Sequence, residues 1–189
     1  MRDRIVETSK FLSYVLRHRP QEIGIELDSE GWTGIDALIA AAARDGRRLD
    51  RALILEVVAG NDKQRFAISS DGLRIRAVQG HSTPAVRISH QALTPPPVLY
   101  HGTASRFVAA IMRQGLRAGA RHHVHLSREY TTAVAVGARH GVPVVLSVDA
   151  AAMDAAGFAF FLADNGVWLT DAVPPRYLGR PQAGTGAGT

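Results

Sequence analysis

The chain has 189 residues, 46% of them hydrophobic and 21% charged, a composition typical of a globular protein of one or two domains rather than a disordered, collagen-like or coiled-coil chain. It contains no cysteine, which excludes disulfide frameworks, cysteine-ligated zinc, iron–sulfur clusters and thiol nucleophiles. The 22 basic residues outnumber the 17 acidic ones, and the net charge of +5 favours a polyanionic partner without requiring one.

The first predicted element is a helix that ends on a basic pair. Its apolar residues recur at helical spacing. Thr8 or Ser9 can cap its start, and Pro20 stops it. Arg17 and His18 therefore fall in the last turn. The apolar residues that define this helix are Phe11, Leu12, Val15 and Leu16.

Further short elements follow Pro20. Apolar residues alternate over 23–27 as in a short strand, and a turn is expected at 29–31. A second helix is predicted from 35 to about 46, and Asp50 is placed to cap a third.

A hairpin is expected after the third helix. Segments 65–69 and 73–77 flank Ser70, Asp71 and Gly72, which form a strong turn signal. Helices followed by a two-stranded wing are typical of a winged helix-turn-helix, which binds nucleic acid in many proteins. Other winged domains serve only as protein contacts, so the pattern alone leaves both roles open.

The segment 94–97, a threonine followed by three prolines, separates two regions that each have their own apolar periodicity. We therefore predict one lobe at 1–94 and a second at 98–180, with a small-residue tail at 181–189 that is expected to be disordered. In the second lobe the pattern predicts strands at 98–100, 124–126 and 142–148, helices near 107–112 and 131–138, and a hairpin of 158–161 with 167–169. The fold class is α+β.

Several familiar sites are missing from the sequence. The glycines of the tail do not follow a strand, so they do not form a dinucleotide-binding loop. His122, His123 and His125 suggest a metal site, but no carboxylate or cysteine stands at a useful spacing to complete it, and we expect no bound metal. No serine-hydrolase elbow or pair of acidic catalytic residues is present.

The cationic residues are more informative. All basic residues except Lys10 and Lys63 are arginines, which bind phosphate through paired hydrogen bonds. Arg17 and His18 lie at a helix end, where a protonated imidazole is favoured. Convergence of these residues with Arg65 and Arg121 would create a phosphate pocket, whereas each alone is most simply a solvated charge.

Seven sequence blocks resemble, in order, the NAD-dependent RNA 2′-phosphotransferase family, whose members remove the splice-junction 2′-phosphate from tRNA. The similarity runs from about residue 8 to 178. The blocks are SKFLSYVLRH at 9–18, DKQRF at 62–66, IRAVQGHS at 75–82, LYHGT at 99–103, GARHHVHLS at 119–127, VGARHG at 136–141 and NGVWLT at 165–170.

This resemblance implies a winged-helix RNA-binding lobe joined to a lobe of the ADP-ribosyltransferase fold that binds NAD+ as a co-substrate. A 2′-phosphate of RNA would attack the nicotinamide riboside of NAD+ and form ADP-ribosylated RNA. The products would be 2′-hydroxyl RNA, nicotinamide and ADP-ribose 1″,2″-cyclic phosphate, and the biological setting would be tRNA splicing or RNA repair. No obligate protein partner is expected.

The resemblance also implies roles for individual residues. The catalytic set would be Arg17, His18, Arg65 and Arg121. Residues that bind the RNA phosphates would be Lys10, Lys63, His81 and Ser82, although His81 and Ser82 could instead only hold a turn. The NAD+ site would comprise His101, Gly102, Thr103, Ser127, Gly137 and Arg139.

Two other functions stay open at this point. A related ADP-ribosyltransferase would modify a terminal phosphate of RNA or DNA and stop after the first step. A winged-helix regulator would sense NAD+ without turnover, bind duplexes sequence-specifically and release no nicotinamide.

Overall fold

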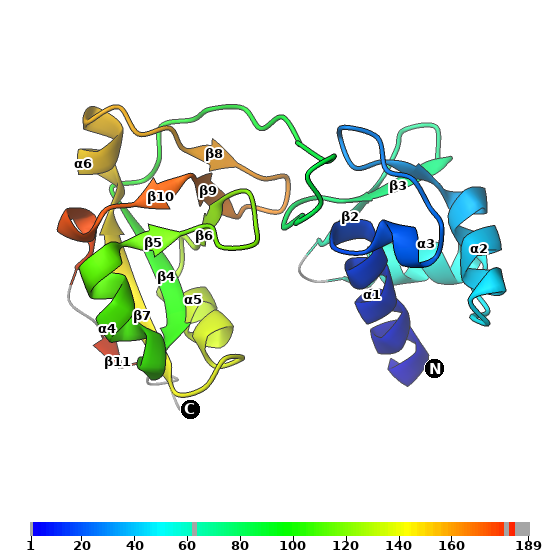
Figure 1. The fold of residues 1–189 in the computed structure, drawn as a ribbon, viewed down its shortest axis with the longest axis horizontal. Coiled ribbons are helices and arrows are strands. Elements are labelled where there is room, and N and C mark those ends of the chain that lie inside the picture. The colour runs from blue at the N-terminus through cyan, green and yellow to red at the C-terminus, as the bar shows by residue number, and fades with distance from the viewer. Residues whose placement is uncertain (1, 62–63, 180–181, 184–189) are drawn as a thin grey trace. The chain divides into compact units, whose positions relative to one another are not determined.

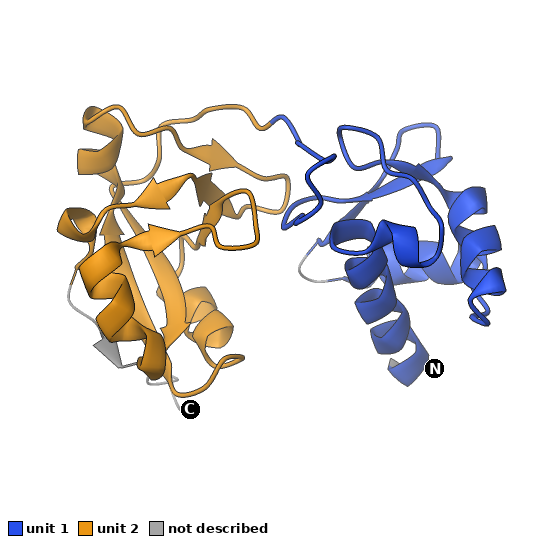
Figure 2. Ribbon diagram, viewed as in Figure 1, with its two compact units in different colours: residues 1–89 blue, residues 90–189 orange. Residues whose placement is uncertain are grey.

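The structure is a computed structural model that describes residues 2–61, 64–179 and 182–183. It divides into two compact units, residues 1–89 and 90–189 (Figure 2). The division thus falls ahead of the proline run at which the sequence places the lobe boundary. Each unit has a hydrophobic core of its own. None of the helices in these residues is long and apolar enough to span a membrane.

Unit 1 combines three helices with a small antiparallel sheet (Figure 1). The sheet order is β1-β3-β2, and β2 and β3 form the predicted hairpin, in which Phe66 faces Ala77. The elements are α1 (Arg2–Arg17), the short 3-10 helix η1 (Pro20–Glu22), β1 (Thr33–Gly34), α2 (Ile35–Arg44), α3 (Arg51–Ala59), β2 (Phe66–Ile68) and β3 (Arg74–Ala77).

Helix α1 is longer than the sequence suggests. It begins at Arg2, so Thr8 lies inside the helix and is buried instead of capping it. The four apolar residues that predicted the helix are all in the core, where burial of each side chain contributes about 1.5–3 kcal/mol. The prediction of the helix is confirmed, but its start was wrong, and His18, expected in the last turn with Arg17, follows the helix end as a turn residue.

The strand predicted at 23–27 is wrong. Ile23 and Ile25 are buried, as the alternation requires, but residues 23–27 pair with no strand. Gly24 has φ +70°, a left-handed conformation that breaks an extended segment. The amides of Gly24 and Ile25 instead bond back to Gln21 and Pro20, so the segment follows η1 as a turn.

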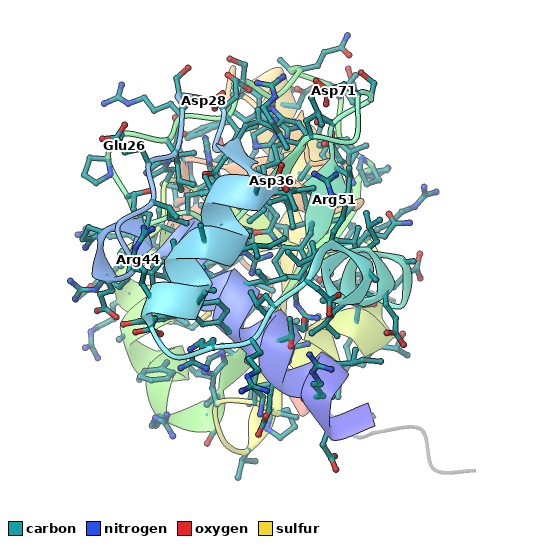
Figure 3. All side chains as sticks on the ribbon, turned by 90° about the vertical axis from the view of Figure 1, so that its right-hand side faces the viewer. Glu26, Asp28, Asp36, Arg44, Arg51 and Asp71 are labelled. Atoms are coloured by element: carbon teal, nitrogen blue, oxygen red, sulfur yellow. The ribbon has the colours of Figure 1, made fainter. Side chains whose placement is uncertain are left out.

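The other predicted helices of unit 1 are confirmed, and polar contacts fix their starts. The Asp50 carboxylate accepts a hydrogen bond from the amide of Leu53 at 2.7 Å, as the predicted N-cap of α3. Arg51 donates to Asp36 at the start of α2 and to the Gly72 carbonyl of the hairpin turn, at 3.1 and 2.7 Å. Figure 3 shows Asp36 and Arg51 on neighbouring helices of this unit.

Unit 2 is built around the antiparallel pair of β4 and β7, which Figure 1 shows in green and yellow. Its elements are β4 (Val98–Ala104), α4 (Ser105–Gln114), β5 (Leu116–Arg117), β6 (Val124–Leu126), α5 (Tyr130–Gly137), β7 (Pro143–Asp149), α6 (Ala150–Ala155), β8 (Phe161–Leu162), β9 (Trp168–Thr170), β10 (Ala172–Val173), the 3-10 helix η2 (Pro175–Tyr177) and β11 (Gln182–Ala183). The sheets have the orders β11-β7-β4, β6-β9-β8 and β10-β5.

Most elements of unit 2 match the sequence analysis, and together with unit 1 they confirm the α+β class. Strand β4 continues to Ala104, beyond its predicted end at Tyr100, because all seven of its residues pair with β7. The predicted hairpin forms from β8 and β9, although β8 begins only at Phe161. Helix α6 and the two-residue strands β5 and β10 were not predicted.

Two segments outside the main elements of unit 2 pair with its strands. Ala92 bridges to Phe161, and the Leu93 amide donates to the Phe160 carbonyl, so the segment before the prolines lies along β8. Gln182 and Ala183 pair with β7, whereas the sequence analysis expected a disordered tail there. The rest of the predicted tail, 181 and 184–189, lies outside the described residues.

Candidate functional site

A groove on unit 1 brings together three of the predicted phosphate-binding cations. Its volume is about 520 Å³, and Lys10, His18 and Arg65 line it together with polar and apolar residues. No carboxylate is among the described residues of its wall. The remaining lining residues are Ile5, Val6, Ser9, Ser13, Tyr14, Val57, Gly60 and Asn61. A groove of this size with basic residues in its wall suits an anionic ligand.

The end of α1 is fastened to the segment that follows β3. The Ser82 amide donates to the Arg17 carbonyl at 2.9 Å, and the Ser82 hydroxyl contacts Nδ1 of His18 at the same distance. His81 beside it is buried, with 4% exposure. Ser82 therefore orients the ring of His18, a member of the predicted catalytic set. The position of His81 also agrees with the alternative that it holds a turn.

Arg17 and Arg65 meet through the main chain. Nη2 of Arg17 donates to the Arg65 carbonyl at 3.4 Å, and the Val78 amide donates to the same oxygen. Gln64 has φ +42°, in the left-handed region that residues other than glycine rarely adopt. This backbone conformation directly precedes Arg65, which lines the groove. Lys63 lies outside the described residues.

Asn61 links Arg65 to α1. Nη1 of Arg65 donates to Oδ1 of Asn61 at 3.3 Å, and Nδ2 of Asn61 donates to the Ser9 hydroxyl at 3.4 Å. These contacts join residues that are 52 positions apart in the sequence. The groove wall is therefore braced by polar contacts as well as by the core beneath it.

In unit 2, His101 of β4 is held by the backbone of β6. Nδ1 of His101 lies 3.1 Å from the His125 carbonyl, which can only accept, so Nδ1 carries the proton. Burial lowers the pKa of His101, as do the charges of Arg121 and His140, against the opposing effect of this hydrogen bond. The ring is therefore neutral at pH 7, and its Nε2 is an acceptor.

Arg121 is positioned by the side chain of His125, the residue whose carbonyl contacts His101. Its Nη1 lies 2.9 Å from Nδ1 of His125, and because a guanidinium only donates, that nitrogen of His125 is unprotonated. Partial burial and the charge of Arg139 lower the pKa of Arg121, which stays protonated because arginine starts above 12. Arg121 thus brings positive charge to the neighbourhood of His101, and Arg139 brings positive charge to the neighbourhood of Arg121.

Gly102 and Gly137 lie where β4 and α5 pack backbone against backbone. A Cβ on Gly102 would overlap the Ala133 carbonyl, and one on Gly137 would lie 2.7 Å from the Thr103 carbonyl oxygen. Both glycines and Thr103 are buried. Packing alone therefore requires glycine at these two positions, and their roles in NAD+ binding stay predictions.

Ser127 lies beside the same strand. Its amide and carbonyl exchange 2.8 Å hydrogen bonds with those of Tyr100, next to His101 in β4. The ring of Tyr100 packs edge to face on that of Tyr130, with 5.7 Å between their centroids. The structure thus places Ser127, His101 and Arg121 around the junction of β4 and β6, while the joining of Arg121 with the unit 1 cations stays a prediction.

His123, one of the histidines that suggested a metal, contacts an acidic side chain and two aromatic rings. His123 lies 3.6 Å from Asp171 and packs on the rings of His90 and Phe161, and burial lowers its pKa despite the charge of Asp171. Within the part of the chain that the structure describes, no three histidine or acidic side chains are grouped as metal ligands.

The sequence analysis missed that Asn61 contacts Arg65 and that His125 contacts Arg121. His125 was considered only as a metal ligand, and Asn61 was not considered. The blocks at 62–66 and 119–127 point to both regions, but a hydrogen bond between two side chains leaves no periodic signal in the sequence. Only the folded geometry shows that Arg65 and Arg121 each have such a neighbour.

Comparison with known proteins identifies the family. Residues 3–172 match the model of the RNA 2′-phosphotransferase, Tpt1 / KptA family. A probable RNA 2′-phosphotransferase of Pseudomonas fluorescens is 62% identical over 174 residues, which cover 92% of this chain and 96% of that protein. A protein with the same description from Pseudomonas aeruginosa is 62% identical, and the alignment covers 91% of this chain and 94% of that protein. One from Escherichia coli is 59% identical, and the alignment covers 92% of this chain and 95% of that protein. The chain belongs to the RNA 2′-phosphotransferase family.

Proposed function

We propose that this protein transfers an internal 2′-phosphate of RNA to NAD+. The reaction proceeds through ADP-ribosylated RNA and yields 2′-hydroxyl RNA, nicotinamide and ADP-ribose 1″,2″-cyclic phosphate. The observation that carries the proposal is the groove of unit 1, where Lys10, His18 and Arg65 share one wall. These three residues come from two separate sequence blocks, 9–18 and 62–66, and a phosphate is the ligand that such a set suits.

The residues of unit 2 have the chemistry that NAD+ requires. The neutral His101 ring offers Nε2 as an acceptor for a ribose hydroxyl or the carboxamide, because its Nδ1 proton is directed to the His125 carbonyl. Arg139 and Arg121 supply positive charge for a pyrophosphate and for the transferred phosphate. NAD+ supplies the electrophilic anomeric carbon and the leaving nicotinamide.

In the first step a 2′-phosphate oxygen attacks the anomeric carbon, and the bond to nicotinamide breaks. The nucleophile is already an anion, so the step needs orientation more than a base, and a held phosphate provides that. Lys10 and Arg17 would hold the phosphate in this step. The absence of a catalytic glutamate is consistent with this chemistry.

In the second step the 2″-hydroxyl attacks the phosphorus, and the bond to the RNA 2′-oxygen breaks. Negative charge gathers on the phosphoryl oxygens, where each fixed guanidinium contributes a few kcal/mol. Arg65 and Arg121 therefore matter most here. His18, oriented by Ser82, moves the proton between the attacking hydroxyl and the departing oxygen.

Product analysis tests the proposal. The protein is incubated with NAD+ and an oligonucleotide that carries one internal 2′-phosphate, and the products are separated by chromatography and mass. We expect 2′-hydroxyl RNA, nicotinamide and the cyclic phosphate in equal amounts. A stable ADP-ribosylated terminal phosphate would contradict the proposal and favour the end-modifying transferase. Tight binding without nicotinamide release would favour the regulator.

His125 is expected to act as a positioning residue for Arg121. Its Nδ1 accepts from the guanidinium, and its carbonyl accepts from His101, so only the first contact depends on the side chain. In His125→Asn the amide oxygen can replace Nδ1, and the second step should keep most of its rate. In His125→Leu the second step should fall by about 10²-fold.

The measurement is the single-turnover rate of each step for both variants, with His122→Leu as a control on the exposed neighbouring histidine. A structural role alone would lower the two steps together and would be accompanied by a lower unfolding midpoint. Equal behaviour of the Asn and Leu variants would contradict the positioning role.

A further inference from the structure

Tyr14 is an aromatic side chain that the proposed reaction does not use. It lies on the face of α1 that lines the unit 1 groove, with the cations Lys10 and His18 on the same wall. The side chain is 44% exposed, whereas Phe11 of the same helix is in the core. An exposed ring is common on protein surfaces. This ring differs in lining a cationic groove.

The Tyr14 ring is held in place at its far end. Its hydroxyl donates a hydrogen bond that both carboxylate oxygens of Glu22 in η1 accept, at 2.8 and 2.9 Å. The Tyr14 carbonyl also accepts from the amides of His18 and Arg19 at the end of the helix. A ring fixed by backbone and hydroxyl loses little conformational entropy when a ligand stacks on it.

The hydroxyl itself is not suited to proton transfer. The hydrogen bond to Glu22 raises the pKa of Tyr14, and the charge of Glu22 adds to this while Arg19 opposes it. The phenol therefore stays protonated at neutral pH. What Tyr14 offers to the groove is an aromatic ring, not an acid or a nucleophile.

The groove thus combines two recognition elements. Lys10 and Arg65 offer positive charge, the His18 ring offers a hydrogen-bonding group, and the Tyr14 ring with Ile5, Val6 and Val57 offers apolar surface. Its volume of about 520 Å³ lies in the range of sites that hold a small organic ligand. A single nucleotide that carries a 2′-phosphate presents both matching groups on adjacent ribose carbons, the base at C1′ and the phosphate at C2′.

We propose that Tyr14 is the stacking platform for the nucleobase of the 2′-phosphorylated nucleotide, so that the groove recognises base and phosphate together. Stacking needs only a planar ring, so this subsite tolerates all four bases. The inference rests on the proposed function, since it takes a 2′-phosphorylated RNA as the occupant. It adds a base subsite to the phosphate site of unit 1.

The test is a binding measurement without NAD+, so that no turnover occurs. An oligonucleotide carries 2-aminopurine in the 2′-phosphorylated nucleotide, and a second one carries it three nucleotides away. Anisotropy of a terminal dye reports binding, and 2-aminopurine fluorescence reports stacking. For the wild-type protein we expect strong quenching with the first oligonucleotide and little with the second.

Three variants separate the contributions. Tyr14→Leu should abolish the quenching and weaken binding about 5- to 100-fold, the range typical of one base stacked on an aromatic ring. Tyr14→Phe keeps the ring but loses the hydroxyl contact to Glu22, so it should retain the quenching and bind less tightly than the wild type but more tightly than Tyr14→Leu. Leu73→Ala removes another exposed apolar side chain of unit 1, outside the groove, and should change neither. The Tyr14 side chain is largely exposed, so the unfolding midpoints should stay close to that of the wild type.

The outcomes distinguish the subsite from the function on which it rests. Binding by anisotropy with no quenching in the wild-type protein, or unchanged quenching in Tyr14→Leu, overturns the subsite and leaves the proposed function standing. No binding of the 2′-phosphorylated oligonucleotide by the wild-type protein overturns both.

Discussion

Replacement of Arg65 by alanine is expected to leave nicotinamide release measurable while ADP-ribosylated RNA accumulates. The first step expels a neutral leaving group, whereas the second gathers negative charge on the phosphorus that Arg65 would stabilise. Loss of one such donor should slow the second step by about 10²- to 10³-fold, and the first step by much less. The same result is expected for Arg121→Ala in unit 2.

The structure favours Arg65→Ala as a clean test. Arg17 and Val78 bond to the main-chain carbonyl of Arg65, which the substitution retains, so the neighbouring cation should stay in place. The measurement follows labelled RNA through single turnover and resolves substrate, intermediate and product. Arg44→Ala and Arg113→Ala, which remove exposed arginines from α2 and α4, serve as matched controls for the two units.

Equal loss of both steps would show that these arginines bind substrate rather than stabilise the second step. Arg65→Lys refines the result, since it keeps the charge and loses the paired donors. Recovery of the second step by lysine would mean that charge alone is sufficient.

Gly102→Ala is expected to unfold unit 2 or to destabilise it by about 3 kcal/mol or more, at the upper end of the cost of overpacking. The new Cβ would overlap the Ala133 carbonyl and lie 2.9 Å from the Gly137 nitrogen. Both neighbours are backbone atoms of α5, so no side chain can rotate away. Relief would require α5 to move off β4.

The two tryptophans allow the effect to be assigned to a unit. Trp32 lies in unit 1 and Trp168 in the core of unit 2, so a Trp32→Phe background leaves Trp168 as the reporter during urea unfolding. Gly34→Ala is the matched control, because its Cβ would meet only the Ala37 Cβ at 3.7 Å. A Gly102→Ala midpoint equal to that of the control would refute the backbone-packing explanation.

The sequence predicted the helices better than the strands. The apolar spacing of α1, α2 and α4 is long enough to identify a helix, and Asp50 marks the start of α3. The alternation at 23–27 was misleading because alternating burial is also produced by a turn that follows η1. Strands of two residues, such as β5 and β10, depend on a distant partner and leave no periodic pattern.

The candidate site was predicted residue by residue, but its geometry was not. The resemblance pointed to His18 and Ser82 as separate contributors, and the structure joins them at 2.9 Å across 64 positions. It also pointed to Arg121 and His101 without indicating that His125 contacts both. Contacts of this kind depend on how strands pair, and neither spacing nor composition records that pairing.

Two neighbouring residues of β4, His101 and Gly102, are constrained for unrelated reasons. Side chains alternate along a strand, so His101 and Thr103 share one face while Gly102 turns the other toward α5. On the proposed function, a change at His101 would lower the reaction rate without unfolding unit 2, whereas a change at Gly102 would lower the stability of unit 2. Loss of activity at these two neighbouring positions would therefore have two different physical causes, which an unfolding measurement separates.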